Sequence, residues 1–206
     1  MSRFYPIIDY DISGPHGPGL AHELAASGCG MLQLRAKGAT SAQFFSFSQR
    51  VLREVPSGCR VIINDRFDIA LACGAAGVHL GELDLPVEAV RGKCPEGFII
   101  GATVRDPEAA RAAETHGADY LGAGAVFPTG SKSDTRLIGL EALGDIAREV
   151  RIPVYGIAGV TLENCAAVIR AGAFGASGIT AVAAAGDPAA AFLALENKLC
   201  AAALSP

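Results

Sequence analysis

The sequence has no tryptophan, and aromatic residues make up only 6% of its 206 residues. Its formal net charge is −4, and its lysines and arginines form no continuous basic run. Surfaces that bind nucleic acid are usually rich in these two residues. The sequence also lacks any uninterrupted apolar stretch near the roughly 18 residues that a membrane-spanning helix needs. These absences argue against a nucleic-acid-binding protein and against a membrane protein.

The cysteines and the N-terminal residues suggest a cellular compartment. Residues 1–9 contain no apolar stretch of the kind found in secretory signals. The six cysteines show no C-x-x-C spacing, which zinc and redox sites often have. Unpaired cysteines are typical of reducing compartments. We therefore expect a cytoplasmic protein whose reduced thiols pack rather than react, at Cys29, Cys59, Cys73, Cys94, Cys165 and Cys200.

Hydrophobic residues are abundant, at 50% of the sequence, whereas charged residues make up 18%. That balance suits a fold whose sheet is buried on both faces. A chain of this length supports one hydrophobic core more readily than two. Because no linker or low-complexity tract interrupts it, we expect one domain spanning residues 1–206.

Short apolar segments alternate with longer amphipathic ones along the whole chain. Strands that alternate with helices predict parallel βαβ units. The expected strands are Tyr5–Asp9, Met31–Arg35, Val61–Asn64, Gly77–Leu80, Ile99–Thr103, Tyr120–Gly122, Val154–Gly156 and Ala176–Thr180.

Three of the expected helices carry recognisable start signals. The D-P-E sequence at 106–108 offers an N-cap, a proline in the first turn and an acid beside it. The D-P sequence at 187–188 does the same before a helix over 189–199. Thr161 is expected to cap a helix over 162–170.

Eight parallel strands could form either a doubly wound sheet or a (β/α)8 TIM barrel. No strand–turn–helix carries the complete G-x-G-x-x-G or P-loop motif that many doubly wound folds use. A barrel places its active site at the carboxyl ends of its strands, and polar residues follow most of the expected strands. We therefore predict the (β/α)8 barrel. Barrels usually have about 250 residues, so the loops must be short.

Three cations and two carboxylates follow strands at this predicted rim. Arg35, Lys37 and Lys132 could bind phosphate oxygens, with arginine offering a planar fork and lysine a point charge. Asp65 and Asp84 are oxygen ligands that suit Mg²⁺, which is usually held by one or two carboxylates and substrate phosphates. Together they predict a diphosphate–Mg²⁺ site.

A second anion site is predicted at the same rim. Gly159 and Gly178 follow the seventh and eighth strands, where barrels commonly bind phosphate through backbone N–H groups. The hydroxyls of Thr129, Ser131 and Thr180 could donate to the same anion.

Each of these residues also has a plainer interpretation. Arg35 and Lys37 could be solvated charges at a helix start, and Asp65 and Asp84 could be helix N-caps. The two glycines could serve tight turns only, the hydroxyls could simply pack, and Glu82 is expected at the surface. The functional interpretation gains because the polar residues gather at one end of the strands.

The histidines offer no convincing general base. We expect His79, inside the fourth strand, to be a hydrogen-bonded structural residue, and His16, His22 and His116 to be exposed. The absence of a histidine or glutamate base at the rim argues against reactions that need strong proton abstraction.

Six stretches of the sequence match a known enzyme family in order. Through them the chain resembles the thiamine phosphate synthases, and the resemblance covers nearly the whole expected barrel. The stretches are QLRAK at 33–37, INDRFDIA at 63–70, GVHLGELDLP at 77–86, ADYLGAGAVFPTGSK at 118–132, PVYGIAGVTLEN at 153–164 and AGAFGASGITA at 171–181.

The resemblance implies a transferase that joins an aminopyrimidine methyl diphosphate to a thiazole ethyl phosphate and releases pyrophosphate. It implies two small-molecule substrates, Mg²⁺ held by Asp65 and Asp84, and catalytic roles for Arg35, Thr103 and Lys132. The implied pyrimidine diphosphate site is Gln33, Leu34, Arg35, Ala36, Lys37, Asn64, Thr103 and Lys132. The implied thiazole phosphate site is Thr129, Gly130, Ser131, Gly159, Ile179 and Thr180. A homo-oligomer is compatible with the sequence, which leaves the oligomeric state open.

The sequence departs from the family pattern at several site positions. Thr103 and Thr180 stand where serine is usual, Ser131 where threonine is common, Glu82 where glutamine is common, and Ala158 where glycine is usual. The hydroxyl replacements keep a hydroxyl, so we expect activity to survive them.

Two alternative functions remain for the same fold. The related thiazole tautomerases depend on a histidine after the fifth strand, where this sequence has Arg105. A non-catalytic barrel that binds phosphorylated ligands is the other alternative, although Asp65, Asp84 and Lys132 are all retained.

Overall fold

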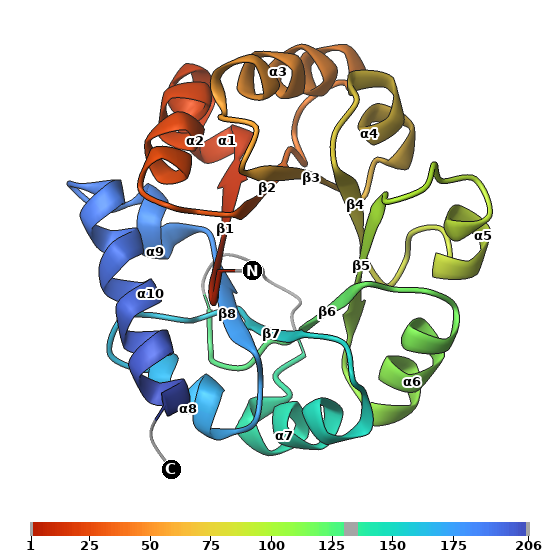
Figure 1. Cartoon of the computed structure of the whole chain (residues 1–206), viewed down its shortest axis with the longest axis vertical. Coiled ribbons are helices and arrows are strands. Elements are labelled where there is room, and N and C mark those ends of the chain that lie inside the picture. Colours follow the sequence, from red (N-terminus) through yellow and green to blue (C-terminus); the bar gives the residue numbers. More distant parts are fainter. Residues whose placement is uncertain (1, 130–135, 205–206) are drawn as a thin grey trace.

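The computed structural model describes residues 2–129 and 136–204. Eight parallel strands pair in chain order into a closed barrel, and β8 returns to pair with β1. Helices surround the ring of strands on the outside (Figure 1). The predicted (β/α)8 architecture is therefore confirmed.

The strands match the expected segments to within two residues at either end. They are β1 Phe4–Asp9, β2 Met31–Arg35, β3 Arg60–Asn64, β4 Gly77–Leu80, β5 Ile99–Val104, β6 Tyr120–Ala123, β7 Val154–Ile157 and β8 Gly175–Gly178.

The helices lie outside the barrel, and all of them except the short first helix and the 3-10 turn have buried residues. They are α1 Tyr10–Ser13, α2 Gly17–Ala26, α3 Ser41–Glu54, α4 Phe67–Cys73, α5 Val87–Arg91, α6 Pro107–Thr115, α7 Gly139–Glu149, α8 Cys165–Arg170, α9 Thr180–Ala183 and α10 Pro188–Leu204, with a 3-10 turn η1 at Gly14–His16. No helix of the described residues is both long and apolar enough to cross a membrane.

Two of the three predicted helix starts are confirmed. The Asp106 carboxylate accepts the N–H of Ala109 at 2.8 Å, and the Asp187 carboxylate accepts that of Ala190 at 2.9 Å. The predicted cap at Thr161 is wrong, because α8 begins only at Cys165. The Thr161 N–H instead donates to the Asn164 side chain at 2.8 Å, which holds the intervening residues in a turn.

The predicted end of the last strand is also wrong. β8 stops at Gly178, so Ile179 and Thr180 belong to the start of α9 rather than to the strand. The ladder to β1 ends at the Pro6–Gly178 pair, and proline has no amide hydrogen with which to extend it. Both residues nevertheless remain at the carboxyl rim.

Polar side chains form a hydrogen-bonded chain through the barrel interior. Gln33 Nε2 donates to the Tyr5 hydroxyl at 3.1 Å, and that hydroxyl lies 2.8 Å from the Tyr120 hydroxyl. The His79 ring continues the chain, with Nδ1 3.0 Å from the Tyr120 hydroxyl and Nε2 3.0 Å from Thr103 Oγ1. Burial raises the pKa of both tyrosines, which therefore stay neutral. His79 is hydrogen-bonded as predicted, and it also fixes the Thr103 hydroxyl at the rim.

Gly101 makes room for this interior chain. A Cβ atom at Gly101 would lie 2.4 Å from the Tyr120 hydroxyl and 2.5 Å from His79 Nδ1. No side chain fits between these groups, so the glycine is needed for close approach rather than for backbone freedom.

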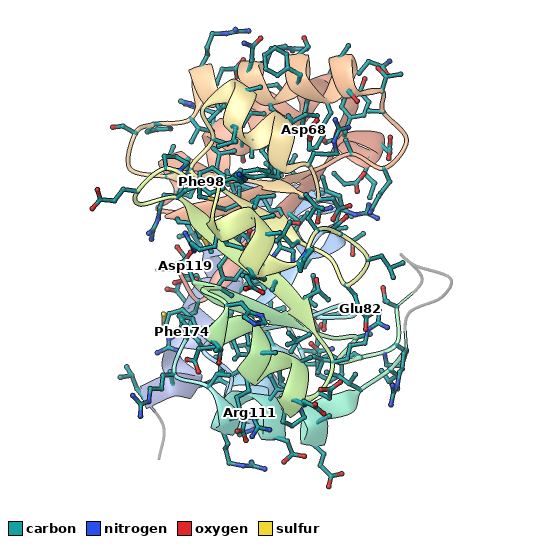
Figure 2. All side chains as sticks on the ribbon, turned by 90° about the vertical axis from the view of Figure 1, so that its right-hand side faces the viewer. Asp68, Glu82, Phe98, Arg111, Asp119 and Phe174 are labelled. Carbon is teal, nitrogen blue, oxygen red and sulfur yellow. The ribbon has the colours of Figure 1, made fainter. Side chains whose placement is uncertain are left out.

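The two ends of the barrel differ in their side chains. In Figure 2, Glu82 lies at one end, whereas Phe98, Asp119 and Phe174 lie toward the other. Glu82 follows the carboxyl end of β4, whereas Phe98, Asp119 and Phe174 precede strands. The predicted site residues therefore belong to the Glu82 end.

Candidate active site

Two pockets lie side by side at the carboxyl rim. We call the first the carboxylate pocket, because Asp65 and Asp84 line it. We call the second the threonine pocket, because Thr129 and Thr180 line it. The residues that line both pockets are Thr103, Arg105, Ile157 and Ile179.

The structure places most of the predicted site residues in the linings of these two pockets. Gln33, Arg35, Lys37, Asn64, Asp65, Asp84 and Thr103 all line the carboxylate pocket. Thr129, Gly159, Ile179 and Thr180 all line the threonine pocket.

Five predicted site residues are not found in either pocket lining. Leu34 is fully buried in the hydrophobic core outside the strands, and Ala36 packs against that core. Gly130, Ser131 and Lys132 lie outside the described residues, so their roles stay predictions.

The two carboxylates of the carboxylate pocket converge above Gly81. A Cβ atom built at Gly81 would lie 3.0 Å from Asp84 Oδ2 and 3.6 Å from Asp65 Oδ1. Asp84 Oδ2 accepts the Gly81 N–H at 2.6 Å. Burial, and then the neighbouring Asp65, raise the pKa of Asp84. Two carboxylates held this close favour a bound cation between them.

Neither aspartate is a helix cap, so that alternative is wrong. The N-cap positions of α4 and α5 are occupied by Arg66 and Pro86 instead. Asp65 adopts a φ of 62°, a left-handed conformation that costs a non-glycine residue about 1–3 kcal/mol. Its N–H donates to the carbonyl of His79 at 2.8 Å, which stabilises this conformation at the end of β3.

The cations of this pocket are paired rather than simply solvated. Lys37 Nζ contacts the Asp65 carboxylate, and Arg35 contacts Asp9 at the end of β1. The Arg35 side chain is 16% exposed and that of Asp9 only 2%. Asp9 was not predicted as a site residue from the sequence, although it is a polar residue at the end of a strand, like the predicted site residues.

Magnesium fits the donor set of the carboxylate pocket. Among the described residues no group of three or more histidine, cysteine, aspartate or glutamate side chains could hold a metal. Mg²⁺ needs only one or two carboxylates when substrate phosphates complete its coordination. Asp65 and Asp84 meet that requirement.

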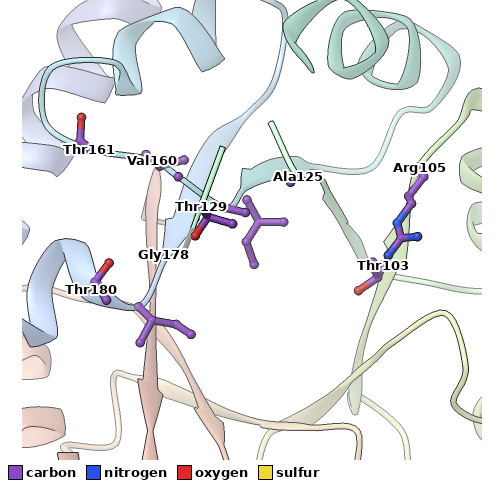
Figure 3. Close-up of a pocket in the computed structure, with 13 residues that line it drawn as sticks. Thr103, Arg105, Ala125, Thr129, Val160, Thr161, Gly178 and Thr180 are labelled. Carbon is purple, nitrogen blue, oxygen red and sulfur yellow. The ribbon is translucent and has the colours of Figure 1, made fainter. Parts of the chain in front are cut away.

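The threonine pocket depends on a close approach between two loops. Gly159 has a φ of 66°, and a Cβ atom there would lie 2.5 Å from the Pro128 carbonyl oxygen and 2.7 Å from Phe127 Cβ. Only glycine satisfies both conditions. Figure 3 shows Gly178 and Thr180 on one side of this pocket, with Thr103 and Arg105 across from them.

Ala158, beside Gly159, is the second non-glycine residue with a positive φ, at 77°. Replacing it with glycine should relieve this conformation and stabilise the protein by about 1 kcal/mol, because glycine reaches positive φ without steric cost. Urea denaturation of the two proteins measures the difference. Ala185→Gly, two residues after the end of α9, is the control, and it should not stabilise the protein. An Ala158→Gly protein no more stable than the wild type would show that the loop carries no strain there.

Comparison with known proteins identifies the family of this chain. A family model described as thiamine monophosphate synthase matches residues 4–182. The chain belongs to this family. It is accordingly a transferase of thiamine biosynthesis built on a TIM barrel.

Individual relatives of the family are similar over most of the chain. A thiamine-phosphate synthase of Haloarcula marismortui is 45% identical over 183 residues, which cover 86% of each chain. One of Haloquadratum walsbyi is 43% identical over 176 residues, covering 84% of this chain and 79% of its own. The structure of a thiamine phosphate pyrophosphorylase from Pyrococcus furiosus superimposes with a TM-score of 0.88 at 35% identity, covering 98% of this chain and 97% of the other.

Proposed function

We propose that this chain is a Mg²⁺-dependent thiamine phosphate synthase. It transfers the aminopyrimidine methyl group from its diphosphate to the nitrogen of thiazole ethyl phosphate, which yields thiamine phosphate and pyrophosphate. The observation that carries the proposal is the pair of adjoining pockets, one with carboxylates and cations and the other with hydroxyls and a glycine loop.

The carboxylate pocket is proposed to hold the pyrimidine diphosphate. Arg35 and Lys37 neutralise the diphosphate, and Asn64 with Gln33 contacts the pyrimidine. Lys132 is proposed to reach the same diphosphate. Bound Mg²⁺, held by Asp65 and Asp84, would further neutralise the charge that develops on the leaving group.

The threonine pocket is proposed to hold the acceptor. Thr129, Gly130, Ser131, Gly159 and Thr180 bind the phosphate of thiazole ethyl phosphate, and Ile179 packs beside the ring. The thiazole nitrogen then faces the wall shared by both pockets, where Thr103 lies.

The chemistry asks for positioning and charge neutralisation rather than for a strong base. The exocyclic amine of the pyrimidine donates electrons as the methylene C–O bond breaks and pyrophosphate departs. The lone pair of the thiazole nitrogen then forms the new C–N bond. Holding both reactants in adjoining sites lowers the entropic part of the barrier, and the cations stabilise the departing charge. The one described histidine that lines either pocket, His79, is held between Tyr120 and Thr103.

An assay with both substrates and Mg²⁺ tests this proposal. The expected result is thiamine phosphate and pyrophosphate in equal amounts, and no product when Mg²⁺ is chelated. Binding of both substrates without product would favour the phosphate-binding barrel, and isomerisation of a thiazole phosphate precursor would favour a tautomerase. The cytoplasmic location and the oligomeric state stay predictions.

A further inference from the structure

Arg105 lies in the wall that the two pockets share. It follows β5 two residues after Thr103, so the alternation of the strand directs both side chains to the inside of the rim. Among the described residues that line both pockets, it is the only charged one. The position joins the leaving-group site to the acceptor site, where the reacting atoms must meet.

The Arg105 guanidinium has a partner at one of its nitrogen atoms and, within the described part of the chain, none at another. Its Nη1 atom lies 2.9 Å from Glu82 Oε2, and the two side chains are 28% and 53% exposed. Its Nε atom is buried and has no hydrogen-bond partner among the described residues. A buried N–H donor without an acceptor is unfavourable, so this atom favours a ligand that supplies one.

The charges around Arg105 indicate which ligand would accept the hydrogen bond from its Nε atom. Glu82 adds a negative charge beside Asp84, in a pocket proposed to bind a diphosphate, and would repel that ligand if it were unpaired. Arg105 neutralises Glu82 and still has the Nε–H free to donate. Across the threonine pocket, Gly178 and Thr180 lie on the far side from Arg105 (Figure 3). The acceptor's phosphate, proposed to bind there, is therefore the less suitable partner.

We propose that Arg105 Nε donates a hydrogen bond to an oxygen of the substrate diphosphate, and that Glu82 positions the guanidinium for this contact. The inference rests on the proposed function. It also assigns a joint role to Glu82 and Arg105, whose ion pair joins the loops after β4 and β5.

Calorimetric titration with pyrophosphate at saturating Mg²⁺ tests the contact. Arg105→Met keeps an apolar stem but has no donor, and it should weaken pyrophosphate binding about tenfold or more, because hydrogen bonds to charged groups are worth that much. Binding of thiazole ethyl phosphate should change by less than about twofold. Arg105→Leu, which also lacks a donor, serves as a second variant in case the methionine protein does not fold. Arg111→Gln is the control, since Arg111 pairs with Glu149 on the outer surface, and it should bind both ligands as the wild type does.

A double variant separates the hydrogen bond from simple charge. Glu82→Gln/Arg105→Met removes one charge of each sign, so the net charge of the rim is unchanged while the donor is lost. Pyrophosphate binding should remain weak in this protein. Recovery to the wild-type affinity, an unchanged affinity in the single variants, or an equal loss for both ligands would overturn the inference.

The wild-type assay distinguishes this failure from failure of the proposed function. A wild type that forms thiamine phosphate, combined with variants that bind pyrophosphate normally, would overturn only the role of Arg105. A wild type that forms no thiamine phosphate would overturn the proposed function and the inference with it.

Discussion

Arg35→Met should destabilise the protein by about 3–5 kcal/mol, in addition to weakening its binding of the pyrimidine diphosphate. Arg35 pairs with Asp9, whose side chain is only 2% exposed. Removing the guanidinium leaves a buried carboxylate whose remaining donor among the described residues is the N–H of Asp11, at 3.0 Å. Urea denaturation measures the loss of stability, and the KM for the pyrimidine diphosphate measures the loss of binding.

The double variant Asp9→Leu/Arg35→Met tells the two roles of Arg35 apart. Replacing both members of a buried ion pair with apolar residues is often close to neutral, so much of the stability should return. Activity should not return, because the cation proposed to bind the diphosphate is still missing. A double variant with wild-type activity would mean that Arg35 only holds Asp9 in place.

A surface pair provides the matched control for this experiment. Arg148 pairs with Asp145 on α7, and these side chains are largely exposed. Arg148→Met should cost no more than about 1 kcal/mol, since exposed ion pairs contribute little. A loss as large as that of Arg35→Met would contradict the argument from burial.

Asp84→Asn should raise the Mg²⁺ concentration needed for half-maximal rate by about 100-fold, because it removes one of two proposed metal ligands. The folded protein should not become less stable. Burial and Asp65 raise the pKa of Asp84, so its charged form is unfavourable in the fold without metal, and asparagine keeps an oxygen for the Gly81 N–H. Initial rates across a Mg²⁺ titration, together with a thermal melt without Mg²⁺, measure the two effects.

Because the pKa of Asp84 is shifted, both Mg²⁺ binding and stability should depend on pH. Because the pKa of Asp84 is raised above its usual value, acidification should protonate it before an ordinary aspartate and weaken Mg²⁺ binding to the wild type. Without metal, the raised pKa means that the folded chain holds this proton more tightly than the unfolded chain, so the contribution of Asp84 to stability falls as the pH rises through that pKa. Asp68→Asn is the control and should leave the Mg²⁺ titration unchanged. Asp68 is an exposed residue of α4 that pairs with Arg66. An unchanged titration in Asp84→Asn would remove Asp84 from the metal site.

The barrel and much of the rim were predictable from the sequence because their signals are local. Each strand is a short apolar run, and the residue types that bind phosphate and metal directly follow those runs. Asp65 and Asp84 are 19 residues apart in the chain, yet the carboxyl ends of parallel strands bring them together.

The features that could not be predicted from the sequence depend on contacts between segments that are distant in the chain. Whether β8 continues past Gly178 depends on its ladder to β1, and the role of Asp9 depends on Arg35 from the next strand. Glu82 was expected only at the surface, and its pairing with Arg105 joins the loops after β4 and β5. No local pattern in the sequence reports these pairings.

Simultaneous binding of two anions is the most direct test of the two-pocket site. Thiazole ethyl phosphate is titrated into protein already saturated with Mg²⁺ and pyrophosphate, and the heat of binding is recorded. One equivalent of thiazole ethyl phosphate should bind with pyrophosphate still in place, because the carboxylate and threonine pockets are separate and adjoining. Displacement of pyrophosphate by the thiazole phosphate would contradict the two-pocket site, since the two anions would then compete for one site.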